Sequence, residues 1–153
     1  MDLKEYNKKR DFSKTKEPKG VVKNALNSKK PKLIYCIQKH DASHLHYDLR
    51  LEMNGVLKSW AIPKEPPKEK GIKRLAVMTE DHPIGYEKFR GEIPKGEYGG
   101  GKVEIWDSGF YELKIKDEKK IEIILCGKKL KGNYVLVKTN FGGKGKSWLF
   151  FKV

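Results

Sequence analysis

The residues best suited to chemistry are concentrated in one short stretch of the chain. Three of the four histidines, His40, His44 and His46, lie close together in sequence, and Asp48 and Arg50 follow them. His46, Asp48 and Arg50 are spaced two apart, and side chains with this spacing lie on the same face of a β-strand. One strand face would therefore carry an imidazole, a carboxylate and a guanidinium in a row. Imidazole and carboxylate groups bind divalent metals, and a guanidinium binds phosphate.

The alternating residues of this strand predict an apolar face opposite the histidines. That face carries an apolar set suited to a core: Leu45, Tyr47, Leu49 and Leu51. On the polar face, His40, His46 and Asp48 form a donor set that suits Mn²⁺, Zn²⁺ or Fe²⁺ and leaves positions open for water and substrate. The alternative is that these histidines are ordinary surface or hydrogen-bonding residues. The spacing leaves both interpretations open.

Four further side chains could contact an anion beside this strand. Arg50 matches phosphate through paired N–H donors, unless it pairs with Glu52 on the same face. Gln38 could orient a ligand or a water, although a polar residue at the end of a strand explains it equally well. His82 precedes a proline, which holds it extended, so it could bind phosphate as an imidazolium or deliver a proton, or be an ordinary loop histidine. Tyr86 offers an O–H donor nearby.

Two other motifs are decoys. The stretch 96–103 fits the glycine and lysine spacing of a phosphate-binding loop, but Val103 stands where Ser or Thr is needed and no helix is expected to follow. Cys36 and Cys126 lie in apolar runs without the spacing of a zinc site, so we expect reduced, buried thiols. We expect core or barrel-rim positions for the three tryptophans: Trp60, Trp106 and Trp148.

The charge balance indicates a polyanionic partner. The 153 residues carry a net charge of +14, which favours nucleic acid over an anionic membrane. Residues 1–32 supply half of that charge, with eleven Lys and Arg against four Asp and Glu. This N-terminal arm is poor in apolar residues, so its composition predicts a partly unfolded or loosely docked segment, with one helical turn possible over 21–26. No signal peptide or membrane-spanning stretch is apparent, which predicts a cytoplasmic protein.

From residue 33 onward the chain reads as short strands separated by turns. Asn54-Gly55 between two apolar-periodic runs is a strong hairpin signal, so the histidine strand should be half of a hairpin. Residues 80–94 read as irregular, and turns are expected at 107–109, 127 and 142–143. The predicted strands are 33–38, 45–52, 56–62, 74–79, 103–106, 111–115, 120–126, 133–138 and 147–152. We therefore expect an all-β protein, a compact antiparallel β-barrel or sandwich of about eight strands with short helical turns, formed by residues 33–153.

Taken together, several segments resemble the 3′-phosphoesterase domain of bacterial and archaeal DNA ligase D. They are Arg10-Asp11-Phe12, Glu17-Pro18, Gln38-Lys39-His40, the run 45–52, the run 55–64, Glu80-Asp81-His82-Pro83 and the run 91–99. The resemblance covers nearly the whole chain in order and implies a compact β-barrel in its free-standing form. It implies an Mn²⁺-dependent enzyme, with Co²⁺ or Zn²⁺ as other metals. Such an enzyme removes a 3′-terminal ribonucleoside and then the resulting 3′-phosphate, leaving a ligatable 3′-OH.

The resemblance also assigns roles by motif. His40, His46 and Asp48 would hold the metal. Arg50 and His82 would contact the scissile phosphate, with Tyr86 and Gln38 close by. Four residues would have supporting roles. Arg10, Asp11 and Glu17 would come from an N-terminal arm folded back as a lid, and the fourth is Glu80. One departure is His44, which stands where the family usually has arginine, so its role stays open.

The partners follow from the same resemblance, and two rival interpretations stay open beside it. The implied substrates are DNA 3′ ends and primer-templates with 3′-ribonucleotides, handled by a nucleoid-associated monomer. A separate DNA ligase, a polymerase or a Ku-like end-binding protein would be its protein partners. One alternative is metal-free cleavage by two histidines through a 2′,3′-cyclic phosphate. Another is a non-catalytic nucleic-acid-binding β-barrel that recruits end-joining factors.

Overall fold

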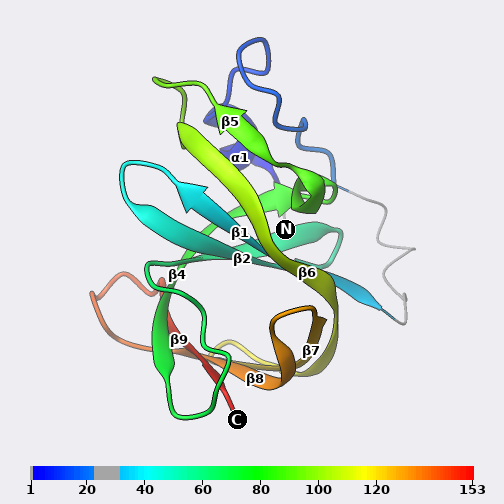
Figure 1. Ribbon diagram of the computed structural model, residues 1–153, viewed down its shortest axis with the longest axis vertical. Helices are drawn as coiled ribbons and strands as arrows, with labels where there is room; N and C mark the ends of the chain where they lie inside the picture. The colour runs from blue at the N-terminus through cyan, green and yellow to red at the C-terminus, as the bar shows by residue number, and fades with distance from the viewer. Residues whose placement is uncertain (1, 23–31) are drawn as a thin grey trace.

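A computed structural model describes residues 2–22 and 32–153 and confirms the all-β prediction (Figure 1). The strands follow one another with short connections, and all pairings between them are antiparallel. Most of the predicted helical turn over 21–26 lies outside the described residues. The elements are α1 (Lys4–Lys8), β1 (Leu33–Asp41), β2 (Leu45–Met53), β3 (Val56–Ile62), β4 (Lys73–Pro83), the 3-10 helix η2 (Tyr86–Lys88), β5 (Gly91–Ile93), β6 (Gly101–Lys116), β7 (Lys120–Gly127), β8 (Lys131–Lys138) and β9 (Ser147–Lys152).

Eight of the strands close into a barrel. The order is β1-β2-β3-β4-β9-β8-β7-β6, and β6 pairs back onto β1. Strand β5 adds to the start of β6, which extends beyond the barrel toward the N-terminal segment (Figure 1). Closure brings Gly101 of β6 so near β1 that a Cβ there would lie 2.3 Å from the carbonyl oxygen of Asp41. Glycine is therefore required where β6 meets the end of β1.

The predicted turn at 107–109 is wrong, because β6 is continuous through it. The Asp107 side chain is buried, and its carboxylate accepts hydrogen bonds from the backbone N–H groups of Lys128, Lys129 and Leu130 at 2.8–3.0 Å. The Tyr35 hydroxyl donates to the same carboxylate at 2.8 Å. Asp107 thus holds the β7–β8 connection from a neighbouring strand, so its polarity marks a long-range contact and no local turn.

The region 80–94 is also more regular than predicted. Strand β4 continues through Pro83, and η2 and β5 occupy part of the remainder. Pro83 ends β4 opposite Val56. This geometry places His82 at the end of a strand, where its backbone is extended before the proline.

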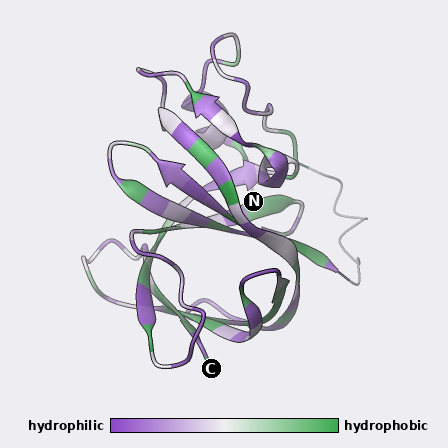
Figure 2. Ribbon diagram, in the orientation of Figure 1, coloured by the Kyte–Doolittle hydropathy of each residue, from purple (hydrophilic) through white to green (hydrophobic). Residues whose placement is uncertain are grey.

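Two apolar clusters lie on opposite sides of the strands β1, β2 and β3. Apolar and polar residues alternate along these strands (Figure 2). The larger cluster fills the barrel and includes Leu49 and Leu51, as the alternation predicts. Leu45 departs from the prediction, since its side chain is exposed. The smaller cluster joins the barrel to the N-terminal segment: Leu3, Tyr6, Val56, Leu57 and Tyr86.

The described part of the N-terminal segment, residues 2–22, is docked on the barrel, whereas its composition predicts a loosely docked or partly unfolded arm. Tyr6 of α1 is fully buried, and its ring contacts His82 and Tyr86 with centroids 5.0 and 5.9 Å apart. Asn7 exchanges hydrogen bonds with the backbone of Gly20, which closes residues 7–20 into a loop. Tyr6 and Leu3 bury apolar area that helps to hold this otherwise polar segment on the barrel.

Both cysteines are free thiols, and Cys36 is buried as predicted. The prediction for Cys126 is wrong, because its side chain faces outward from β7 into solvent. Trp60 and Trp148 lie in the core, and Trp106 packs against it while partly exposed. Among the described residues, no helix has the length and apolar character required to cross a bilayer.

Replacing Asp107 with alanine is expected to destabilise the barrel by about 4 kcal/mol, because buried backbone N–H groups lose a charged acceptor. Urea unfolding followed by tryptophan fluorescence measures this change. Asp117→Ala is the matched control, since Asp117 accepts from two backbone N–H groups in an exposed turn. It should cost about 1 kcal/mol or less. If Asp107→Ala and Asp117→Ala lowered the free energy of unfolding equally, burial of the Asp107 carboxylate would not contribute to its effect on stability.

Candidate metal and phosphate site

The β1–β2 pairing aligns the predicted ligands. His40 lies directly across from His46, and Gln38 lies across from Asp48. The hairpin between β2 and β3 turns at Asn54 and Gly55, which have φ values of 51° and 82°. Positive φ at both positions is the signature of the predicted tight turn. The turn fixes the register of β2, and with it the face that carries the histidine, carboxylate and guanidinium.

The three predicted metal ligands come together around one point. The ligand atoms of His40, His46 and Asp48 all lie within 4.8 Å of one another. Asp48 Oδ2 is 3.6 Å from His40 Nδ1 and 3.2 Å from His46 Nε2. Asp48 and His40 are buried, and His46 is half-buried. The three donors therefore converge from two adjacent strands, with one side open to the cavity described below.

The second nitrogen of each imidazole is held by a backbone carbonyl. His40 Nε2 lies 2.6 Å from the carbonyl oxygen of Gly99, and His46 Nδ1 lies 3.0 Å from that of His44. A carbonyl only accepts, so both of these nitrogens carry the proton. The other nitrogen of each ring, Nδ1 of His40 and Nε2 of His46, faces the Asp48 carboxylate. Metal-binding histidines commonly donate their other N–H to a carbonyl in this way, which leaves the facing nitrogen for the metal.

The charges of the cluster agree with a cation site. Burial opposes ionisation of Asp48, but the Arg50 charge and the hydrogen bonds with His40 and His46 hold the pKa of its carboxyl far below the usual range. Burial likewise opposes the charged form of His46, yet Asp48 outweighs it and raises the pKa of that imidazole. Asp48 is therefore a permanent buried anion, and positive charge beside it is stabilised.

Arg50 is fixed beside this cluster. Its Nε donates to Gln38 Oε1 at 2.7 Å, and its Nη1 donates to Ser59 Oγ at 2.8 Å. Its guanidinium lies 4.7 Å from the centre of the Tyr86 ring, and Nη2 is 3.6 Å from Asp48 Oδ2. Two edges of the group are occupied, so Nη2 is the part that faces the cavity.

Gln38 holds Arg50 in position without lining the cavity itself. Its Nε2 donates to the carbonyl oxygens of Tyr86 and Phe89 at 2.7 and 2.9 Å, while Oε1 accepts from Arg50. The side chain is fully buried and is absent from the cavity lining. Its amide is thus committed to Arg50 and to η2, which makes direct phosphate contact by Gln38 a poor fit to this geometry.

His82 is neutral in this environment. Its Nδ1 lies 2.9 Å from the carbonyl oxygen of Glu80, so Nδ1 carries the proton and Nε2 faces Arg10 Nη2 at 3.4 Å. Burial, followed by the positive charges of Arg50 and Arg10, holds the pKa of His82 well below its usual value. The expected imidazolium is therefore absent until an anion enters and offsets those charges.

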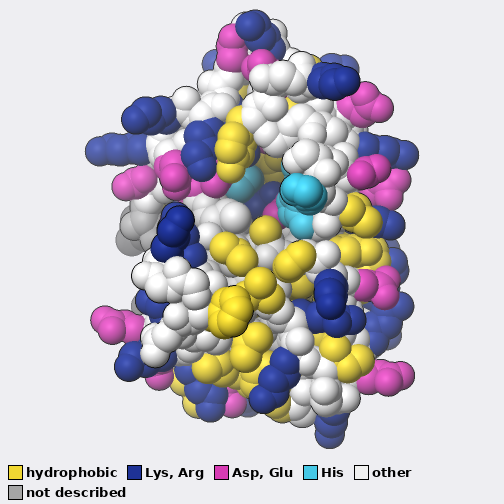
Figure 3. Space-filling view, turned by 90° about the vertical axis from the view of Figure 1, so that its left-hand side faces the viewer, with side chains coloured by type: hydrophobic (Ala, Val, Ile, Leu, Met, Phe, Trp, Pro, Cys, Tyr) yellow, Lys and Arg dark blue, Asp and Glu magenta, His cyan; other side chains and the backbone are white. Residues whose placement is uncertain are grey.

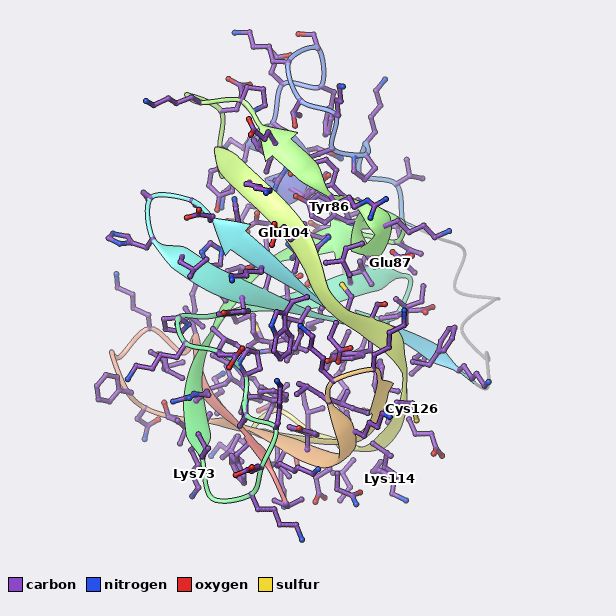
Figure 4. All side chains as sticks on the ribbon, viewed as in Figure 1. Lys73, Tyr86, Glu87, Glu104, Lys114 and Cys126 are labelled. Carbon is purple, nitrogen blue, oxygen red and sulfur yellow. The ribbon has the colours of Figure 1, made fainter. Side chains whose placement is uncertain are left out.

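The N-terminal segment contributes directly to the site. Arg10 lines the cavity; its Nε donates to Glu17 at 3.0 Å, and Nη1 lies 3.5 Å from Glu80. Tyr86, which is labelled in Figure 4, also donates its hydroxyl hydrogen to Glu17, so the segment is bonded to η2. Asp11 differs, because it is exposed and accepts from Ser13. Its contribution is limited to the turn that follows Arg10.

These groups surround a cavity of about 320 Å³. Figure 3 shows the hollow with histidine side chains at its rim and charged side chains within it. Its lining joins the metal cluster to the cationic groups: Arg10, His40, Ala42, His46, Asp48, Arg50, Ala61, Thr79, Glu80, His82, Tyr86, Ile93, Tyr98 and Gly99. His44 is outside this lining and exposed, and it serves the site through its backbone carbonyl.

Sequence reasoning missed three contributors to the site. Ser59 holds Arg50, Gly99 holds His40, and Tyr98 lines the cavity. The glycine-rich stretch was correctly excluded as a phosphate-binding loop, but it forms one wall of the cavity. An aromatic beside glycines in a basic protein was an available signal for Tyr98. Gly99 gave none, because its partner His40 is remote in sequence. Ser59 lies opposite Arg50 across the predicted hairpin, so the register of that hairpin was an available signal for it.

His82 is expected to make stability depend on pH. The unfolded imidazole binds a proton below about pH 6.5, whereas the folded one does not until a much lower pH. The unfolded state then binds more protons, so stability should fall as pH decreases, by up to about 1.4 kcal/mol per unit. Urea unfolding of the wild type and His82→Gln in EDTA, between pH 7.5 and 5, measures the difference. Parallel stability curves for the two proteins would contradict this assignment.

Comparison with known proteins places this chain in a protein family. A family model described as the DNA ligase D 3′-phosphoesterase domain matches residues 38–138. The chain is 46% identical over 156 residues to the multifunctional non-homologous end joining protein LigD of Pseudomonas aeruginosa. It is 49% identical over 160 residues to the protein of that name from Mycolicibacterium smegmatis.

These alignments cover 98% and 96% of this chain but 18% and 20% of the two relatives. The chain therefore spans about a fifth of the length of these relatives. The range matched by the family model includes the His40, His46 and Asp48 cluster as well as Arg50 and His82. The chain belongs to the DNA ligase D 3′-phosphoesterase domain family.

Proposed function

We propose that this chain is a 3′-end-processing enzyme of DNA repair with two activities. As a phosphodiesterase it removes a 3′-terminal ribonucleoside, and as a phosphomonoesterase it removes the 3′-phosphate that results. The product is a 3′-OH end, which is the substrate of a ligase or a polymerase. The observation that carries the proposal is the cavity that combines three metal-binding donors with buried guanidinium groups. Membership of a 3′-phosphoesterase family supports the same reaction class.

The donor set fits a divalent transition metal, and we propose Mn²⁺. His40 Nδ1, His46 Nε2 and Asp48 Oδ2 would hold it, because these atoms converge and carry no proton in the neutral tautomers. Two nitrogens and one carboxylate oxygen also suit Co²⁺ or Zn²⁺. When bound, the metal would supply Lewis acidity toward a phosphoryl oxygen and toward water. The backbone carbonyls that hold both rings keep the donors in place before it binds.

Arg50, Arg10 and His82 form the phosphate side of the proposed site. Arg50 Nη2 and Arg10 Nη2 can each donate to a phosphoryl oxygen, since their other edges are occupied by protein groups. Charge that develops on those oxygens is stabilised by donors already in position. The unprotonated Nε2 of His82 can accept a proton from a phosphate monoanion or from water. The phosphate charge would then stabilise the resulting imidazolium between the two arginines.

The N-terminal arm, residues 1–32, is proposed to be a lid that belongs to the site. Arg10 and Glu17 connect it to His82 and Tyr86, so its position determines whether the phosphate side is complete. Its basic residues would hold the flanking nucleic acid strand, and this attraction should weaken with salt. A Ku-like end-binding protein, a ligase or a polymerase would act on the same DNA end.

The test is a 5′-labelled primer–template that ends in one ribonucleotide, incubated with MnCl₂ or EDTA. Metal-dependent conversion first to a 3′-phosphate and then to a 3′-OH end is the expected result. Activity that persists in EDTA through a 2′,3′-cyclic phosphate would favour metal-free cleavage instead. Binding of the primer–template without turnover in any metal would leave the protein a nucleic-acid-binding barrel and overturn the proposal.

A further inference from the structure

Tyr98 is an exposed aromatic side chain at the rim of the proposed active site. It lies in the connection between β5 and β6 and lines the same cavity as the metal cluster. Its side chain is 47% exposed, whereas Tyr6 and Tyr86 beside the cavity are 0% and 3% exposed. Those two rings pack against other rings, and no ring–ring contact involves Tyr98 among the described residues. Tyr98 thus leaves aromatic surface open at the entrance.

The ring is held in place although it is exposed. Lys9 Nζ lies 4.6 Å from the ring centre and 3.4 Å from the Tyr98 hydroxyl. The Arg10 guanidinium lies 5.3 Å from the same ring centre. Cations over an aromatic ring are attracted to its π-electrons, so Lys9 and Arg10 restrain the ring. A restrained ring loses little conformational freedom when a ligand stacks on it.

Tyr98 is also adjacent to both halves of the site. The next residue, Gly99, accepts the hydrogen bond from His40 Nε2 at 2.6 Å. Arg10, which contacts the ring, has its Nη2 3.4 Å from His82 Nε2. A phosphate bound between the metal cluster and Arg10 would therefore place its attached nucleosides next to the Tyr98 ring. Aromatic side chains stack on such bases without selecting their sequence.

We propose that Tyr98 is a stacking platform for a nucleobase of one of the two nucleosides attached to the scissile phosphate. This inference rests on the proposed function and adds a residue that selects substrates bearing a base at that position. Lys9 and Arg10 supply positive charge beside the platform for the sugar–phosphate backbone.

The test compares Tyr98→Leu and Tyr98→Phe with the wild type on primer–templates in MnCl₂. Tyr98→Phe keeps the ring and should stay within about twofold of the wild type. Tyr98→Leu should lower kcat/KM about tenfold on a substrate with normal bases, the range typical of one lost base stack. In a second comparison, the same three proteins act on substrates with a single abasic residue at the terminal or at the penultimate nucleoside. At one of these two positions the Tyr98→Leu defect should disappear.

The comparison separates the inference from the proposed function. Absence of 3′-end turnover by the wild type would overturn the proposed function and the inference with it. Wild-type turnover together with a Tyr98→Leu defect of equal size on all substrates would overturn the stacking role alone. Mn²⁺ affinity is the control for displacement of Gly99 and His40, and it should be the same in all three proteins. A defect that tracks weakened Mn²⁺ binding would also count against stacking.

Discussion

Asp48→Asn is expected to lower kcat/KM for the proposed 3′-end processing by at least about 10³-fold, because the proposed metal site would lose its carboxylate ligand. Asparagine keeps the size of the side chain but removes the anion that His40 Nδ1 and His46 Nε2 face. Mn²⁺ affinity should fall by about 100-fold or more, which isothermal titration calorimetry measures directly. Asp48 joins both histidines at one oxygen, so no other single donor in the cluster can replace it.

The control for this variant is Glu112→Gln, which removes one exposed carboxylate from the outer surface of the barrel. It should leave both Mn²⁺ affinity and turnover unchanged. Thermal unfolding in EDTA shows whether Asp48→Asn still folds, since Arg50 keeps its hydrogen bonds to Gln38 and Ser59. A folded Asp48→Asn protein with wild-type Mn²⁺ affinity would remove Asp48 from the metal site.

Arg50→Lys should be nearly as damaging to turnover although it preserves the charge. Lysine presents a single ammonium group, which cannot bond Gln38 and Ser59 and still donate in a fixed direction into the cavity. The expected loss in kcat/KM is about 10²- to 10³-fold, the usual effect of removing one oriented donor to a developing oxyanion. Mn²⁺ affinity should change little, because the three ligands stay in place. Inhibition by inorganic phosphate should weaken in parallel with turnover.

Arg90→Lys is the matched substitution, because Arg90 is exposed and lies outside the cavity lining. It should be neutral in every assay. If Arg50→Lys retained full activity, positive charge alone would suffice at this position. The hydrogen bonds that orient Arg50 would then have no catalytic role, and Gln38 and Ser59 would be structural residues only.

Much of the barrel was predictable because its signals are local. The alternation in β2 and the Asn54-Gly55 turn specify a hairpin and its register without help from other segments. The same alternation placed Asp48 and Arg50 on one face. The β6 strand was divided wrongly because Asp107 has the local character of a turn residue. Its partners, the N–H groups of 128–130, belong to a connection about twenty residues away.

The burial of the polar face of β2 could not be predicted from the sequence of that strand alone. Strand periodicity marks it as the solvent side, yet Asp48 and Arg50 are 7% and 3% exposed. The N-terminal segment, η2 and the loop with Tyr98 cover that face, and they come from three separate parts of the chain. Their docking depends on contacts such as Tyr6 with His82, which composition does not reveal.

The sequence by itself determined the β2–β3 hairpin and the shared face of His46, Asp48 and Arg50, because each depends on neighbours along the chain or across one turn. The tertiary structure decided which nitrogen of each histidine carries a proton and that His82 is neutral. It also turned an exposed strand face into a buried site. These properties depend on burial and on charges brought from remote segments, and the electrostatic effect of a charge depends on distance in space and on exclusion of water.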